Sequence, residues 1–129
     1  YWGLSSLLRT GDYFNVQMCY HDIPEHLNPF DYETFDKNPS KGYAVVTNIE
    51  TGLAEYLPMK NMHRNIDAVR ASASMPLVSR PVEINGKLYL DGGLADSIPL
   101  LHAVTDGCRK NVVVMTKEAG YRRVQPKHL

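Results

Sequence analysis

The hydrophobic positions of residues 63–74 recur at helical spacing. Four apolar side chains fall on one face of a helix wheel: Met62, Ile66, Val69 and Ala73. Pro76 disfavours the helical conformation of the residue before it, so the pattern predicts a helix that ends near Ser74.

Three other segments have the composition of β-strands. Residues 43–49 are rich in β-branched side chains, and a second strand is predicted over 53–57, after the Thr51-Gly52 turn. Residues 82–90 predict a hairpin, because the central Asn85-Gly86 tolerates the positive φ angles of a type I′ turn.

The C-terminal part alternates helical and strand patterns. A helix is predicted from near Ser97 to Gly107, with Pro99 in its first turn. Residues 111–116 are a short, almost continuously apolar run, which is typical of a strand buried on both faces of a parallel sheet.

The N-terminal part is less regular. Residues 3–9 show weak helical spacing, and residues 13–40 predict an irregular excursion with a short helix near 32–36. Two interpretations of its aromatic side chains have equal weight: they line an acyl pocket, or they pack the core under a loop. These side chains are Tyr13, Phe14, Tyr20, Phe30, Tyr32 and Phe35.

The order of these elements predicts an α/β fold in a single domain over 1–129, with 122–129 as a tail. The expected architecture is a central mixed or parallel sheet with helices on both faces. The buried run 111–116 needs strand neighbours, so we expect an incomplete sheet with exposed apolar area, completed by self-association or by another part of the protein.

Composition narrows the function classes. Hydrophobic residues make up 43% of the 129 and charged residues 22%, which is ordinary for a globular domain. The 14 basic and 14 acidic side chains balance, so a nucleic-acid partner is not expected. Because Cys19 and Cys108 lack framework spacing, they predict free thiols in a reducing, cytoplasmic compartment.

No metal or other cofactor is expected. The five histidines show no metal-ligand spacing, and a structural or exposed role is the favoured interpretation for His21, His26, His63, His102 and His128. A small basic cluster near the end is interpreted as a solvated tail or, less favoured, as a contact with anionic lipid headgroups: Arg122, Arg123 and Lys127.

The first candidate for chemistry is Asp91, at the carboxyl end of a predicted strand and followed by Gly92 and Gly93. Open α/β sheets place ligands at such ends, and two glycines allow a substrate to approach the carboxylate closely. For the tripeptide taken alone, a plain Asp-Gly turn that caps the strand is the favoured interpretation.

Two longer segments carry a family resemblance. Residues 70–76, Arg-Ala-Ser-Ala-Ser-Met-Pro, and residues 89–100, Tyr-Leu-Asp-Gly-Gly-Leu-Ala-Asp-Ser-Ile-Pro-Leu, stand in this order and resemble patatin-like phospholipases. The similarity is greatest to the small bacterial esterase subgroup, and residues 28–32 and 47–52 are similar to it too. It covers most of 1–121.

The resemblance implies a serine acyl-hydrolase that uses a Ser-Asp dyad, acts on lipid or other acyl esters and needs no cofactor. The family's Asp-Gly-Gly motif falls on Asp91, Gly92 and Gly93. A serine hydroxyl needs a base to take its proton, and an aspartate serves only if it is close and partly desolvated. Contact with a membrane surface at its periphery is a further expectation.

The chain departs from the family pattern in one respect, because it contains no Gly-x-Ser-x-Gly. Since it also starts at Tyr1 without an initiator methionine, we expect a C-terminal fragment that supplies the aspartate but not the serine and is inactive alone. Ser72 and Ser74 lack the paired glycines of a nucleophile elbow, and packing at a helix end is favoured for both. For Asp96, capping of the following helix is favoured over a paired-carboxylate site with Asp91.

The rival hypothesis is a non-catalytic lipid-binding or interaction module that kept part of a patatin-like fold. A Gly-rich loop and a Gly-x-Ser-x-Gly upstream of residue 1 would favour the enzyme.

Overall fold

The computed structural model describes residues 2–118 and 120–122. The chain divides into two compact units, Tyr1–Ser97 and Ile98–Leu129, and each is described by itself. Apart from Arg122, the tail predicted at 122–129 lies outside the described residues.

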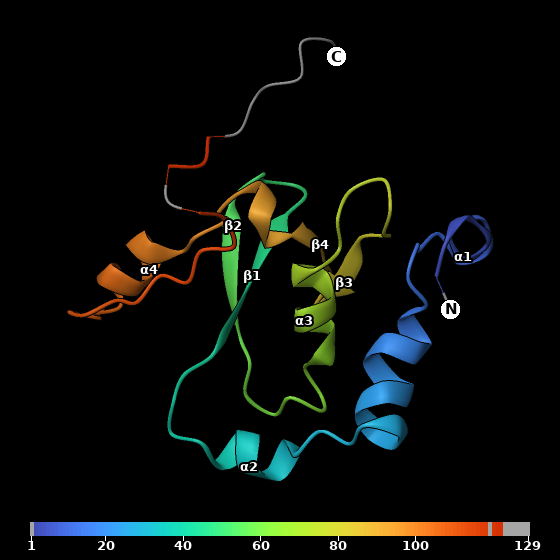
Figure 1. The fold of residues 1–129 in the computed structure, drawn as a ribbon, viewed down its shortest axis with the longest axis horizontal. Coiled ribbons are helices and arrows are strands. Elements are labelled where there is room, and N and C mark those ends of the chain that lie inside the picture. The colour runs from blue at the N-terminus through green and yellow to red at the C-terminus, as the bar shows by residue number, and fades with distance from the viewer. Residues whose placement is uncertain (1, 119, 123–129) are drawn as a thin grey trace. The chain divides into compact units, whose positions relative to one another are not determined.

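The first unit is built on a four-stranded sheet with strand order β2-β1-β4-β3 (Figure 1). Its strands are β1 Tyr43–Asn48, β2 Ala54–Pro58, β3 Val82–Ile84 and β4 Lys87–Asp91. Helices and strands occur together, which confirms the α/β class. The predicted parallel pairing is not supported, because all three pairings among the described strands are antiparallel. Tight turns join β1 to β2 and β3 to β4, and such turns return a strand only in the antiparallel sense.

The hairpin of β3 and β4 is confirmed in register and turn type. Val82 lies opposite Tyr89 and Ile84 opposite Lys87. Asn85 and Gly86, between the strands, have φ angles of 53° and 78°. Positive φ at both central positions is the condition for a type I′ turn.

The helices of the first unit are α1 Leu4–Thr10, η1 Met18–Leu27, α2 Tyr32–Lys37, α3 Ile66–Ser72 and the 3-10 turn η2 Gly92–Leu94. The helices expected near 3–9 and 32–36 are confirmed. The irregular course predicted for 13–40 is wrong for η1, which is a π-helix containing Pro24. A helix with i→i+5 hydrogen bonds does not follow the 3.6-residue period on which the prediction relied.

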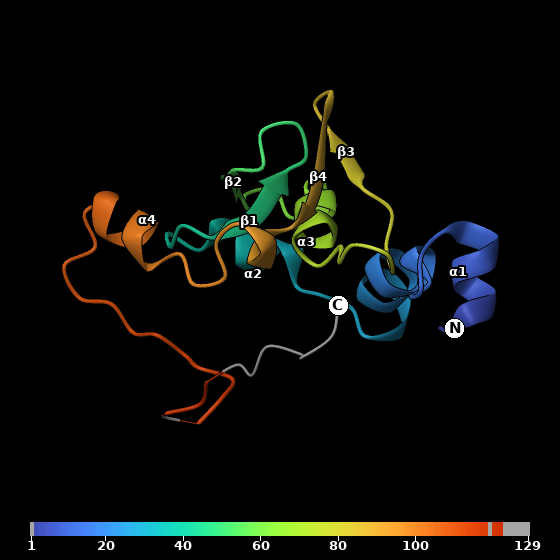
Figure 2. The ribbon, with the colours of Figure 1, turned by 90° about the horizontal axis from the view of Figure 1, so that it is seen from above.

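Helix α3 packs on the sheet and forms the core with it (Figures 1 and 2). The buried cluster is Val46, Ala71, Val82 and Tyr89, with Leu57 and Ile84 partly buried against it. The helix is shorter than predicted, and its buried face was predicted only in part, since Met62 is buried but Ile66 and Val69 are only half-buried. Ala73 is exposed, and the fully buried positions within α3 are Ala68 and Ala71. These two small side chains lie three residues apart and let the helix backbone approach the sheet closely.

The second unit contains α4, Leu100–Thr105, which starts later than predicted, because Pro99 is its N-cap and does not lie in its first turn. Gly107, predicted to end the helix, follows it at φ 90°. The strand predicted over 111–116 is wrong, since none of these residues is in a strand. Val112 is 93% exposed and Val114 is 88% exposed. A strand buried on both faces needs neighbouring strands, and the described residues of this unit contain none. The expected exposed apolar area is therefore present.

Candidate active site

Asp91 is the last residue of β4 and lies opposite the fully buried Val46 of β1. Its side chain is half-buried. The carboxylate oxygen Oδ1 accepts a hydrogen bond from the Gly93 backbone N–H at 2.7 Å. The other oxygen, Oδ2, accepts none of the hydrogen bonds found among the described residues. The carboxylate is thus oriented through one oxygen while a lone pair remains for a proton.

The glycines after Asp91 differ in what they permit. Gly92 is buried, and a Cβ there would lie 2.1 Å from the carbonyl oxygen of Val45. Only glycine fits this close approach of backbone to backbone. At exposed Gly93 a Cβ would lie 3.0 Å from Oδ1 of Asp91, so a side chain here would press on the carboxylate itself.

The backbone of Asp91 is held by two neighbouring segments. Its N–H donates to the carbonyl of Ser74 at 2.9 Å, which joins the end of β4 to the segment after α3. Its own carbonyl accepts a hydrogen bond from the Thr47 hydroxyl of β1 at 2.8 Å. Thr47 and Ser74 are both buried, so these bonds are shielded from water. The position of Asp91 therefore depends on three separate stretches of sequence.

The loop after the glycines is closed on itself and tied to β2. The Ser97 hydroxyl donates to the Gly93 carbonyl at 2.9 Å, and the Asp96 N–H donates to the Gly92 carbonyl at 2.8 Å. The Tyr56 hydroxyl donates to Oδ2 of Asp96 at 2.6 Å, and this hydrogen bond raises the pKa of Tyr56. Thr47, Tyr56 and Ser97 are positioning residues that the sequence analysis missed. The partners of Thr47 and Tyr56 depend on strand register and not on local pattern.

The structure corrects the role expected for Asp96. It does not cap α4, whose N-cap is Pro99 and which has no side-chain cap hydrogen bond. The hydroxyl of Tyr56 competes for the carboxylate of Asp96 and holds it toward β2 instead. Asp96 thus fastens the loop that follows the catalytic candidate.

The two serines near the end of α3 differ in what the structure shows of their surroundings. The Ser74 hydroxyl is buried and donates to the Arg70 carbonyl at 2.8 Å, four residues back. A hydroxyl engaged in this way at a helix end has a structural role, as expected. Ser72, within α3, is half-buried.

The ion-pair contacts of the histidines in the described residues are with Glu25 and Asp106, not with Asp91. His21, His26 and His63 lie 3.7–4.0 Å from the carboxylate of Glu25, and His102 lies 3.8 Å from Asp106. His128 lies outside the described residues. Among residues 2–118 and 120–122, no group of three or more His, Cys, Asp or Glu side chains is arranged to hold a metal ion.

Two further findings concern the thiols and the lengths of the helices. Cys19 and Cys108 are both free, as predicted. Within the described part of the chain, no helix is long and apolar enough to cross a membrane.

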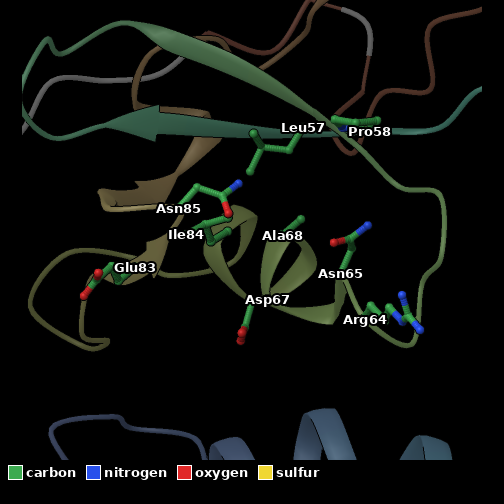
Figure 3. A pocket seen from close by; sticks show the side chains of 9 residues that line it. All are labelled: Leu57, Pro58, Arg64, Asn65, Asp67, Ala68, Glu83, Ile84 and Asn85. Carbon is green, nitrogen blue, oxygen red and sulfur yellow. The ribbon is translucent and has the colours of Figure 1, made fainter.

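A cavity among the described residues of the first unit does not include Asp91. It has a volume of about 360 Å³ and lies between the end of β2, the start of α3 and the β3–β4 turn (Figure 3). Its charged lining residues are Arg64, Asp67 and Glu83. Asp91 and its glycine turn therefore lie outside this cavity.

Comparison with known proteins decides the family. A family model described as "Patatin-like phospholipase" matches residues 1–104, about four fifths of the 129. The chain belongs to the patatin-like phospholipase family. The resemblance inferred from residues 70–76 and 89–100 is thereby confirmed, and both segments lie inside the matched range.

One curated relative of this patatin-like chain is the Uncharacterized protein YjjU of Escherichia coli (strain K12). It is 39% identical over 62 residues, which is 47% of this chain and 17% of the relative. The chain thus spans well under two thirds of the relative's length. No solved structure matches the chain.

Proposed function

We propose that this chain supplies the catalytic aspartate, Asp91, of a serine acyl-hydrolase that cleaves acyl esters of lipids. The observation that carries the proposal is the Asp91 turn. One carboxylate oxygen is fixed by the Gly93 N–H while the other remains available, at the end of a strand in a member of the patatin-like phospholipase family.

The serine would come from a part of the protein outside these 129 residues, since no Gly-x-Ser-x-Gly occurs within them. Asp91 takes the proton from the serine hydroxyl as the serine oxygen attacks the ester carbonyl. The proton passes to the leaving alcohol, and an acyl-serine ester forms. Water then attacks this ester with Asp91 again as the base, which releases the fatty acid and restores the serine.

The surrounding residues support this role by fixing the position of Asp91. Thr47 and Ser74 hold the Asp91 backbone from two sides, and Gly92 permits the tight path that turns the chain away from β1. Because neighbouring residues fix the position of the carboxylate, it does not have to be oriented again in each turnover. Such fixed orientation makes proton transfer efficient.

The test is hydrolysis of a soluble short-chain ester by the protein that includes the proposed serine segment. Asp91→Asn keeps the shape and removes the base, so activity should fall by at least about 100-fold. Asp67→Asn, an exposed carboxylate of α3 remote from this turn in sequence, is the matched control and should keep wild-type activity. Near wild-type activity in Asp91→Asn would reject Asp91 as the base.

A second measurement separates the enzyme from a non-catalytic module. The 129-residue chain alone should show no turnover. Robust turnover that is abolished by Ser72→Ala or Ser74→Ala would overturn the proposal that the serine lies elsewhere. A longer protein with no serine elbow and no activity would favour the lipid-binding module.

A further inference from the structure

Helix α1 presents an apolar edge that no other part of the described first unit covers. None of its residues is buried, and the two leucines that lie four positions apart are largely in water, Leu4 at 72% and Leu8 at 86% exposure. Trp2 and Phe14, which flank the helix, are exposed at 68% and 50%. Four large apolar side chains are thus exposed within residues 2–14, and a gathering of this kind is typical of an interaction surface.

The edge is held in place by the rest of the unit. Trp2 and Phe14 form an antiparallel bridge, and the Trp2, Tyr13 and Phe14 rings are in contact with centroids 6.1 Å and 5.2 Å apart. Asp12 accepts a hydrogen bond from the Arg80 N–H at 2.8 Å, which fastens this segment to the loop before β3. In both views α1 lies at the outer side of the unit, away from the sheet (Figures 1 and 2).

A polar cavity of about 240 Å³ adjoins the apolar edge. It is lined by Trp2, the hydroxyl residues Ser5, Ser6 and Thr10, Asn15 and the guanidinium of Arg9. Ser5 and Arg9 directly follow Leu4 and Leu8, so on α1 the polar stripe lies beside the apolar one. Arg9 is the only charged residue of the lining, which makes this cavity suited to an anion.

We infer that α1 and its flanks dock on an anionic phospholipid bilayer, with Trp2, Leu4, Leu8 and Phe14 in the interface and a headgroup phosphate at Arg9. The aromatic and aliphatic edge matches the acyl chains of such a lipid. The adjoining cavity, lined by hydroxyl groups and an arginine, matches its charged headgroup. This inference rests on the proposed function in one respect, because a lipid-ester hydrolase must reach its substrate at a membrane surface. It names the partner surface, which the Asp91 turn does not.

Trp2 is the only tryptophan among the 129 residues and reports directly on this contact. The 129-residue chain is mixed with vesicles of phosphatidylcholine alone or with added phosphatidylglycerol. Co-sedimentation and the Trp2 emission maximum are then recorded. We expect binding to the anionic vesicles, accompanied by a blue shift of Trp2 emission as the indole leaves water.

The variants address each half of the surface. Leu4→Ser with Leu8→Ser should weaken vesicle binding at least about tenfold, since both lose apolar contact with lipid. Arg9→Gln should weaken binding to anionic vesicles roughly fivefold. The exposure of all three residues means that the fold is retained, which far-ultraviolet circular dichroism checks.

Matched controls lie elsewhere on the chain. Leu101→Ser removes an equally exposed leucine of α4, and Arg64→Gln removes an exposed arginine near α3. Both should bind as wild type. Binding that is lost in Leu101→Ser but kept in the α1 variants would overturn the inference, as would bound protein whose Trp2 emission stays unshifted. The absence of binding to anionic vesicles would overturn it outright.

The outcome separates this inference from the proposed function. Vesicle binding requires neither the serine nor Asp91, so Asp91→Asn should bind as wild type. Asp91-dependent hydrolysis of a soluble ester without vesicle binding would reject the membrane surface alone. A longer form of the protein in which Trp2 emission is already shifted and does not respond to vesicles would also reject it, because another part of the protein would then cover α1.

Discussion

The β3–β4 hairpin with its Asp91 turn and the apolar run at 111–116 follow each other closely in the sequence, yet they differ completely in structure. The hairpin has its predicted register and turn, and Asp91 at its end is held by bonds to Thr47, Ser74 and Gly93. The run has higher β-propensity but forms no strand and leaves Val112 and Val114 in water. The hairpin finds its partner across a two-residue turn, whereas the run needs neighbours that the described residues of its unit do not provide.

The largest expected effect lies at Gly92, where the backbone that follows β4 approaches β1 closely. Gly92→Ala would place a Cβ 2.1 Å from the Val45 carbonyl oxygen and should cost about 3 kcal/mol of unfolding free energy. Urea denaturation followed by circular dichroism measures the loss. Gly93→Ala is the matched control, since its Cβ would meet side-chain atoms and no backbone, Oδ1 of Asp91 at 3.0 Å and Oγ of Ser97 at 3.9 Å, and it should cost much less. Equal costs would show that the approach of Gly92 to β1 is not the constraint.

Tyr89, in the middle of β4, predicts a pH dependence for the hairpin. Burial, followed by the hydrogen bond that its hydroxyl donates to Glu55, raises the pKa of Tyr89 to about 12 from the ordinary value near 10. The fold favours the neutral phenol, so this contribution is complete below about pH 10 and is lost as the pH rises toward 12. The loss should be about 2 kcal/mol.

The measurement is the urea midpoint of wild type and of Tyr89→Phe between pH 9 and about 12. The lysines titrate in both proteins, so the difference between the two midpoints removes their effect. Only wild type should show the extra decline. A parallel decline in both proteins would mean that the Tyr89 hydroxyl is not the group concerned.

The type I′ turn should be less sensitive than the Gly92 contact. Gly86 has φ 78°, but nothing lies within 4 Å of the position of a Cβ, so Gly86→Ala introduces backbone strain alone. We expect a loss of about 1 kcal/mol in thermal or urea unfolding. Gly42→Ala, at a position without positive φ and with ordinary 3.6 Å contacts, should be within about 0.5 kcal/mol of wild type. A cost for Gly86→Ala as large as that for Gly92→Ala would remove the distinction between strain and clash.

The smallest effect is expected in the apolar run. Val112→Thr with Val114→Thr should change the unfolding free energy by less than about 0.5 kcal/mol, because both side chains are exposed. Val46→Thr, at a fully buried β1 position, makes the same chemical change and should cost more than about 1 kcal/mol. A loss above about 1 kcal/mol in the run would show that it is buried in the folded chain.

Sequence reasoning succeeded where a feature is encoded within a few residues. Asn85-Gly86 predicted the hairpin, and Gly11 and Gly107, both at positive φ, follow the ends of helices α1 and α4. Residues 70–76 and 89–100 together indicated the family, which the comparison with known proteins confirmed.

The same reasoning failed where structure depends on distant partners. The face of α3 was assigned to large apolar residues, but the small Ala68 and Ala71 lie against the sheet because they allow close packing. The parallel sheet was inferred from 111–116, but the described residues of its unit contain no strand with which the run could pair. The bonds of Thr47 and Tyr56 to the Asp91 loop could not be found before the register of β1, β2 and β4 was known.

The proposal that Asp91 activates a serine is tested most directly by the rate at which a fluorophosphonate modifies that serine. The protein that includes the serine segment is labelled as wild type, Asp91→Asn and Asp67→Asn, and the modified residue is located by mass spectrometry. We predict that Asp91→Asn labels at least about 100-fold more slowly while Asp67→Asn labels as wild type. Labelling of Asp91→Asn at the wild-type rate would contradict the assignment of Asp91 as the base.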